Sequence, residues 1–247
     1  MGIDTLVARM RGALAVMESA GDARRFFLAT YLRTTVAVRD ELSAGGFGDA
    51  EWVERWDVVF ADLYLDAVER ADRGEPVPLP WAVAFDATRL PPLRHVLLGM
   101  NAHINFDLPQ ALLAVITPAE FDDPVRMAER KADHQHLDRL LARRVPAEDR
   151  ELVRLGGATR TDRLLRPLNQ SGTRRFLRES RDKVWDNARA LDGARRAGAD
   201  VLAGRLQELE VLSARRVEQL SAPGQVLLKL AVRGFGVRLP APGGASC

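Results

Sequence analysis

One segment of the chain, residues 93–109, combines two properties that rarely occur together. Its apolar residues fall on almost every side of a helix, and helices of this kind are usually buried. The same segment carries five polar side chains, namely His95, Asn101, His103, Asn105 and Asp107. A buried polar group without a partner costs about 1–3 kcal/mol. The segment therefore predicts a central buried helix whose polar residues form either a functional site or a hydrogen-bonded structural network.

The rest of the chain has helical periodicity, and no run of alternating apolar and polar residues predicts a strand. We expect one all-α domain over residues 1–233, a single-domain helical bundle of about eight or nine helices around the central polar helix. Residues 234–247, rich in Gly, Pro and Ala, are predicted to form a flexible C-terminal tail. Capping and breaking residues predict helices over 3–20, 22–43, 50–73, 92–108, 117–145, 173–191, 194–220 and 225–232. Residues 158–170 are predicted to form a short helix or turn. Residues 75–90 are predicted to form an extended loop, which Trp81 and Phe85 pin to the core.

Composition narrows the class of protein. Hydrophobic residues make up 47% of the chain, which is enough for a packed core, and no window resembles a transmembrane segment. The charged residues near the N-terminus do not fit a secretory signal. The only cysteine is Cys247, so neither an internal disulfide nor a cysteine metal site is expected. We expect a cytoplasmic bacterial protein, and its oligomeric state is left open.

Charge is distributed unevenly along the chain. Residues 1–149 carry 17 basic and 24 acidic side chains, a net charge of −7, whereas residues 150–247 carry 19 and 10, a net charge of +9. The two halves could attract each other or simply present solvated faces. A basic surface for an anionic ligand is the alternative. No nucleic-acid-binding motif accompanies the basic half, so nucleic acid is not an expected partner.

His103 and Asp107 are four residues apart, so their side chains lie on one face of the predicted helix, about one turn apart. They could bind one metal ion together, or Asp107 could orient the imidazole of His103 for acid–base chemistry. His95 lies on a neighbouring part of the helix surface, and Asn105 points to the opposite side. We predict His103, Asp107, Asn105 and His95 as catalytic candidates. The alternative is a structural network bonded to neighbouring helix ends.

Two more carboxylates extend the metal hypothesis. Asp66 falls within the apolar stripe of the predicted 50–73 helix, with Asp62 one turn earlier at its edge. Carboxylates that face histidines across a core are typical of metal sites in helical bundles. Asp186 could reach the same site, so the predicted metal ligands are His103, Asp107, Asp66 and Asp186. Alternatively, Asp62 and Asp66 pair with arginine at the rim, and Asp186 lies on a solvated face.

A second histidine cluster lies at residues 133–136, with the sequence Asp-His-Gln-His. His134 and His136 are two residues apart on a predicted helix, so they point in different directions and do not readily share a metal ion. We expect Asp133, His134 and His136 to lie mostly on the surface.

The segment His-Ile-Asn-Phe-Asp-Leu-Pro at residues 103–109 also carries a resemblance. Together with the preceding Gly-Met-Asn-Ala and the downstream Val-Trp at 184–185, it resembles a bacterial family known only as a domain of unknown function. The resemblance extends over most of the chain, from the tryptophan-rich third helix to the helix with Trp185. It implies an all-α fold and brings no established activity.

A shorter stretch resembles the zinc-dependent phospholipase C and P1-type nuclease superfamily, which is also all-α. His103, Asp107, Gln110 and Leu112 follow the order of its His-x-x-Gly-Asp-x-His-Gln-Pro-Leu-His segment, in which the His and the Asp four residues later bind zinc. The sequence Val-Trp-Asp at residues 184–186 is similar to a second ligand segment, Leu-His-x-Val-Trp-Asp.

This chain departs from that pattern at several ligand positions. Phe106 replaces the glycine, Pro109 and Leu113 replace the two later histidines, and Asp182 stands where a ligand histidine is expected. The departures speak against a three-zinc site. They leave one divalent metal ion, with zinc as the first choice, or none.

Three functions are consistent with these patterns. The first is an enzyme that acts on a small-molecule or lipid-like substrate at a buried His/Asp site, with a metal-dependent hydrolase as one form of it. The second keeps the site without a metal, as an acid–base isomerase, lyase or cyclase of an apolar metabolite. The third is a non-catalytic ligand-binding or structural helical protein.

Overall fold

The helices of the protein come from three stretches of chain. The computed structural model describes residues 2–154, 166–222 and 236–241. The helices are α1 (Ile3–Ser19), α2 (Arg25–Ser43), α3 (Ala50–Asp72), α4 (Leu79–Asp86), α5 (Pro92–Ala102), the π-helix η1 (His103–Asp107), α6 (Leu108–Val115), α7 (Pro118–Asp122), α8 (Pro124–Arg154), α10 (Arg166–Ala197) and α11 (Ala199–Ser221). Counted with α5, η1 and α6 as one continuous helix, the described residues form nine helices and no strand. The predicted all-α bundle is confirmed.

Local sequence explains several helix boundaries. The side chain of Asp49 accepts a hydrogen bond from the Trp52 N–H (3.0 Å) and so caps the start of α3. Thr117 and Glu120 form a capping box at the start of α7, ahead of Pro118. Gly74 follows α3 with a φ of 69°, a left-handed conformation that glycine adopts without steric cost.

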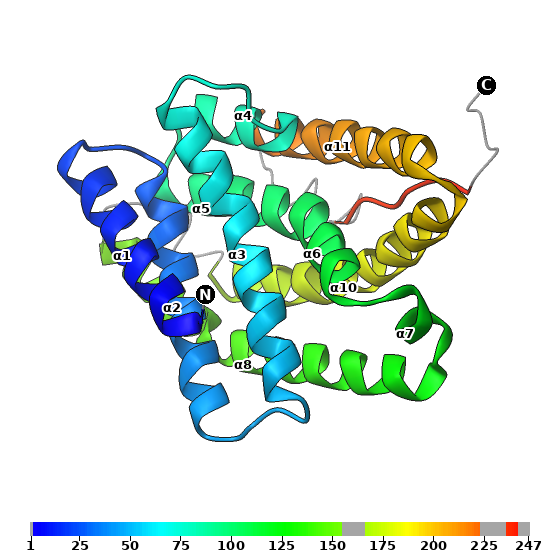
Figure 1. Cartoon of the computed structure of the whole chain (residues 1–247). Helices are drawn as coiled ribbons and strands as arrows, with labels where there is room; N and C mark the ends of the chain where they lie inside the picture. The colour runs from blue at the N-terminus through cyan, green and yellow to red at the C-terminus, as the bar shows by residue number, and fades with distance from the viewer. Residues whose placement is uncertain (1, 155–165, 223–235, 242–247) are drawn as a thin grey trace.

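The continuous run α5–η1–α6 lies in the middle of the bundle, as the predicted central helix requires (Figure 1). It contacts α2 and α3 on one side and α10 and α11 on the other. Every residue from 101 to 109 is buried. A helix surrounded on all sides has no face left for solvent, which explains why its sequence is apolar almost all the way round.

Two hydrophobic clusters surround this central run. The larger one joins α1, α2, α3 and α4 to α5 and α6, and its fully buried members include Trp52, Trp56, Tyr64 and Trp81. The smaller one lies on the other side, where Phe106 and Leu113 meet Leu191 of α10 and Leu209 of α11. Residues of the C-terminal segment complete it, namely Val237 and Leu239, which are each 6% exposed.

Residues 236–241 therefore differ from the predicted flexible tail. Figure 1 shows this segment, coloured red, running in extended form between α10 and α11. Its two apolar side chains fill a gap between helices, and burial of apolar surface offsets the entropy lost on ordering the segment.

Three other boundaries differ from those predicted. Residues 79–86 of the expected loop form α4, because proline at the first turn is compatible with a helix. The stretch expected as one helix over 117–145 is divided at Asp123 into α7 and α8. Helix α10 continues through Gly193 and ends at Ala197, just before Gly198, whose φ of 132° favours glycine. The helix predicted over 225–232 and residues 158–165 lie outside the described residues.

The helices were also compared in length and hydropathy with membrane spans. Among the three described stretches of chain, no helix is both long enough and apolar enough to cross a bilayer.

Candidate functional site

The central run changes its helical form at the residues singled out by the sequence. Residues 103–107 form a π-helix between two α-helices, in which the Leu108 N–H donates to the His103 carbonyl, five residues earlier. Pro109 has no N–H to donate to the Asn105 carbonyl four residues earlier. At the next position, the side chain of Gln110 donates to the Phe106 carbonyl (2.9 Å). Short π-helical turns are rare and occur frequently at functional sites.

His103 and Asp107 form a direct pair within this turn. His103 Nδ1 lies 2.8 Å from Asp107 Oδ2, and the two side chains are 4% and 2% exposed. The same carboxyl oxygen accepts a hydrogen bond from Trp81 Nε1 on α4 (2.9 Å). Asp107 thus holds the imidazole by its Nδ1 atom, and Nε2 is left as the nitrogen that could meet another molecule.

Aromatic rings enclose the imidazole of His103. The Phe60 ring stacks on it with a centroid distance of 3.6 Å and an interplanar angle of 5°. Tyr31 meets it edge-on at 4.6 Å. Phe27, Tyr64 and Trp81 lie within 6.1 Å of it. Together these five rings form an aromatic cage, to which α2, α3 and α4 each contribute one face. Its members are Phe27, Tyr31, Phe60, Tyr64 and Trp81.

Burial shifts both members of the pair toward their neutral forms. It lowers the pKa of His103 well below its usual value. It also raises the pKa of Asp107 well above its usual value, a rise that the hydrogen bond from Trp81 partly opposes. A neutral imidazole beside a protonated carboxyl is therefore the expected state, because burial in the apolar cage disfavours the charged form of each group.

Among the residues that the structure describes, several polar atoms of the cage are buried and have no hydrogen-bond partner. They are the Nε2 atom of His103 and the hydroxyl groups of Tyr31 and Tyr64. Burial raises the pKa of each tyrosine well above its usual value, and the charge of Asp57 adds to the effect at Tyr31. A buried polar group left unsatisfied is costly, so a cluster of them suggests that the cage accommodates a water molecule or a ligand.

Asp57 of α3 is a further buried carboxyl, and it was not among the residues predicted from the sequence. This carboxyl is 6% exposed, and one of its oxygens, Oδ2, is buried with no hydrogen-bond partner in the described part of the chain. Burial raises the pKa of Asp57 to about 7. A signal was available, because Asp57 lies four residues after Val53 and seven before Tyr64, on the buried stripe of the helix.

The other two catalytic candidates are buried away from the pair. His95 stacks on Phe26 of α2, with ring centroids 5.8 Å apart, and burial lowers its pKa. Asn105 faces the C-terminal segment, where its Oδ1 atom accepts a hydrogen bond from the Val237 N–H (3.2 Å). The predicted opposite orientation of Asn105 is thus found, but it places Asn105 beside a polypeptide backbone and not beside His103.

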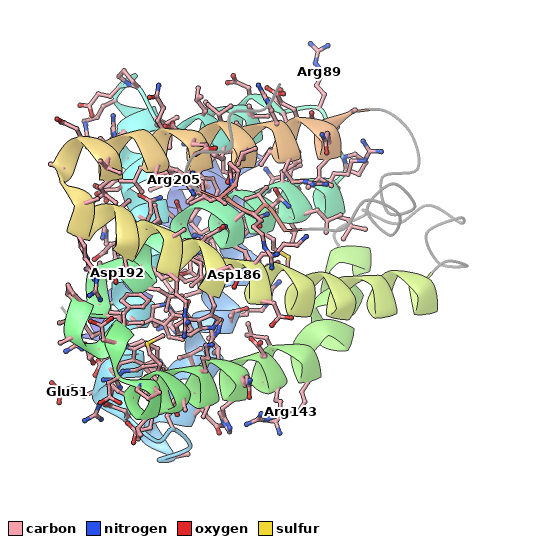
Figure 2. The ribbon with its side chains drawn as sticks, turned by 90° about the vertical axis from the view of Figure 1, so that its right-hand side faces the viewer. Glu51, Arg89, Arg143, Asp186, Asp192 and Arg205 are labelled. Carbon is pink, nitrogen blue, oxygen red and sulfur yellow. The ribbon has the colours of Figure 1, made fainter. Side chains whose placement is uncertain are left out.

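The predicted set of four metal ligands does not come together. Asp66 is exposed on α3, because the buried stripe of that helix passes through Tyr64 and Val68 and leaves Asp66 on the opposite side. Asp186 is exposed on α10, where Figure 2 labels it, and pairs with Arg238. Asp62 forms the alternative rim contact, a 2.7 Å salt bridge with Arg9.

The remaining donors do not fit a zinc site. His103 and Asp107 are bonded to each other, and Asp107 Oδ2 also accepts from Trp81. Within the residues that the structure describes, no group of three or more His, Cys, Asp or Glu side chains is placed to hold a metal ion. We therefore derive no chemistry through zinc.

The second histidine cluster is more buried than expected. His134 is 1% exposed and accepts a hydrogen bond at Nδ1 from Trp185 Nε1 (2.7 Å). The Asp133 carboxylate accepts from the backbone N–H groups of Gly48 and Asp49, which joins α8 to the start of α3. His136 points elsewhere, as its spacing from His134 predicts: it is half-buried and bonds to Glu41. The expected surface position of Asp133 and His134 is wrong, because Trp56 of α3 and Trp185 of α10 pack against this face of α8.

The sequence matches a known protein family over most of its length. Residues 3–223 match a family of unknown function, DUF5995. The chain belongs to this family. The match includes the π-helix, the aromatic cage and all of the helices α1–α11, so the DUF5995 region and the bundle coincide. No curated protein matches the chain, and no solved structure matches it.

Proposed function

We propose that this DUF5995 protein is an acid–base enzyme, an isomerase, lyase or cyclase that acts on a mostly apolar small molecule without a metal ion. The observation that carries the proposal is the His103–Asp107 pair inside the aromatic cage, where His103 Nε2 is buried and has no hydrogen-bond partner among the described residues. A buried polar atom of this kind calls for an explanation, and a bound molecule supplies one.

The pair offers a way to move a proton without forming a buried cation. In the neutral state, the carboxyl proton of Asp107 lies toward Nδ1, and Nε2 carries the second proton. When Nε2 donates its proton to a substrate, the carboxyl proton passes to Nδ1. The imidazole stays neutral, and the Asp107 carboxylate that results is stabilised by the Trp81 N–H. The reverse transfer makes Nε2 a general base.

The aromatic lining of the cage is of the chemical kind that binds apolar substrates. Its walls are aromatic, and aromatic faces also stabilise positive charge on a bound molecule. The hydroxyl groups of Tyr31 and Tyr64 are neutral donors that could orient one polar group of the substrate. Sites of this kind typically combine an apolar lining with a few placed polar groups.

Access requires a side chain to move, because His103 is only 3% exposed. Phe60 is the candidate, since its ring covers one face of the imidazole and is itself partly exposed. A change in the Phe60 rotamer would open that face without displacing a helix.

Proton transfer can be followed before the substrate is known. The full-length protein is incubated in D2O with a library of apolar small molecules that contain alkenes or carbonyl groups, and deuterium uptake is measured by mass spectrometry. The wild type should label one class of compound, and His103→Gln should not. Asp66→Asn, at an exposed position, serves as the control and should label as the wild type does. The proposal is wrong if the wild type labels nothing or if His103→Gln labels equally.

A further inference from the structure

The C-terminal segment is held in a manner that differs from ordinary helix packing. Residues 236–241 are extended, and their neighbours are helices, whose backbone groups are already hydrogen-bonded internally. An extended segment in such surroundings needs side-chain partners for its own N–H and C=O groups.

Two buried asparagines supply these partners. Asn187 of α10 donates from Nδ2 to the Val237 carbonyl (3.1 Å) and accepts at Oδ1 from the Leu239 N–H (2.9 Å). Asn105 of η1 accepts from the Val237 N–H (3.2 Å). Both asparagines are 1% exposed. Three backbone polar groups of the segment, two on Val237 and one on Leu239, are thus recognised without reference to its side chains.

Two cationic side chains extend the same contact to the ends of the segment. Lys183 Nζ donates to the Gly236 carbonyl (3.1 Å), and an Arg205 guanidinium nitrogen donates to the Pro240 carbonyl (2.7 Å). Figure 2 labels Arg205 on α11 and Asp186 on α10, on the two helices that flank the segment. Asp186 pairs with Arg238, the residue between the two buried apolar positions.

Only alternate side chains of the segment, those of Val237 and Leu239, are buried against the helices. Val237 and Leu239 point into the smaller hydrophobic cluster beside Phe106 and Leu209, while Arg238 is exposed. This is the pattern of an extended strand, in which successive side chains point to opposite sides. Backbone hydrogen bonds combined with sites for alternate side chains are also how proteins bind extended peptides.

We propose that the face formed by Asn105, Lys183, Asn187 and Arg205 is a peptide-binding site. Its ligand is an extended segment with apolar residues at alternate positions, and residues 236–241 are its intramolecular occupant. A peptide of the same pattern competes with that occupant in trans. Asn105 belongs to η1, so the peptide site and the His103–Asp107 pair share one turn of helix.

A fluorescein-labelled peptide Gly-Val-Arg-Leu-Pro-Ala, with the sequence of residues 236–241, tests the proposal by fluorescence anisotropy. The double variant Val237→Asp/Leu239→Asp of the full chain should release its own segment and bind the peptide saturably. The wild type should bind at least about tenfold more weakly, because its own segment competes at a high effective concentration. Adding Asn187→Ala to the double variant should abolish binding, and a peptide with Asp in place of Val and Leu should not bind. Equal binding with and without Asn187→Ala would overturn the proposal, as would no gain over the wild type.

A second measurement uses the unaltered chain, in case the double variant fails to fold. Hydrogen exchange should show slow amides at Val237 and Leu239, because both N–H groups donate to buried asparagine oxygens. Millimolar unlabelled peptide should speed both amides by displacing the segment. Exchange that is fast in the free protein, or unchanged by the peptide, contradicts a peptide site.

Discussion

Trp81 Nε1 donates a hydrogen bond to Asp107 Oδ2 across 26 residues of chain, at 2.9 Å and away from solvent. The same carboxyl oxygen lies 2.8 Å from His103 Nδ1, so one atom joins α4 to the π-helix and to the imidazole. The indole is therefore the third member of the site. Variants of these residues distinguish a proton-transfer pair from a structural contact.

Replacing Trp81 with phenylalanine should cost about 1–3 kcal/mol of unfolding free energy, because the carboxyl loses a buried donor while the aromatic ring is kept. Trp56→Phe is the matched control, since the Trp56 Nε1 atom is buried and no described residue is its hydrogen-bond partner. Chemical denaturation of both variants measures the difference. A Trp56→Phe loss as large as that of Trp81→Phe would show that volume, not the hydrogen bond, sets the cost.

Asp107→Asn should preserve stability at neutral pH, because burial already favours a neutral carboxyl and the amide has nearly the same shape. The amide oxygen can still accept from Trp81. If the pair were instead an ion pair, the substitution would leave a buried imidazolium and cost about 3–5 kcal/mol. Thermal melts at pH 7 distinguish the two states. Loss of deuterium transfer with an unchanged melt would assign the carboxyl to proton transfer.

Asp57 should make the protein less stable as pH rises from about 4 to 7. Its pKa is raised by burial to about 7, so within this range the folded state retains a proton that the unfolded state has released. The difference amounts to on the order of 4 kcal/mol across the interval.

Asp57→Asn removes this titration, so the variant should gain stability relative to the wild type at pH 7.5 and match it near pH 4. Urea denaturation at several pH values measures the difference curve, in which contributions from other carboxyls cancel. A flat difference curve would mean that Asp57 ionises normally in the folded protein.

Gly99 allows α2 and α5 to approach each other closely. A Cβ atom built at this position would lie 2.4 Å from the Phe27 ring, one helical turn before His103. Gly99→Ala should therefore destabilise the protein by about 1–3 kcal/mol and displace one wall of the aromatic cage.

Gly12→Ala is the control for helix propensity, because a Cβ atom at Gly12 of α1 would meet nothing within 4 Å. This variant should gain about 0.5–1 kcal/mol. Calorimetry compares the two alanine variants. If both are stabilised, Phe27 has room to move and the close approach carries no constraint.

Properties that depend on one helix at a time could be predicted from the sequence. The all-α fold follows from periodicity and capping, and the burial of residues 101–109 follows from the lack of a polar face. The pairing of His103 with Asp107 follows from their spacing, because residues four apart on a helix are neighbours whatever surrounds them.

Properties that depend on which helices meet were decided by tertiary packing alone. Trp81 reaches Asp107 because α4 forms within the predicted loop and packs beside α5. Asp66 is exposed and lies on the opposite side of α3 from Asp57, because the packing of α3 against its neighbours decides which side of that helix is covered. The segment around Val237 is held by hydrogen bonds with Asn105 and Asn187. These two residues lie on helices far apart in the chain and meet only in the folded protein. Spacing along a helix is set by its own geometry, whereas contacts between distant elements are set by how all the helices pack together.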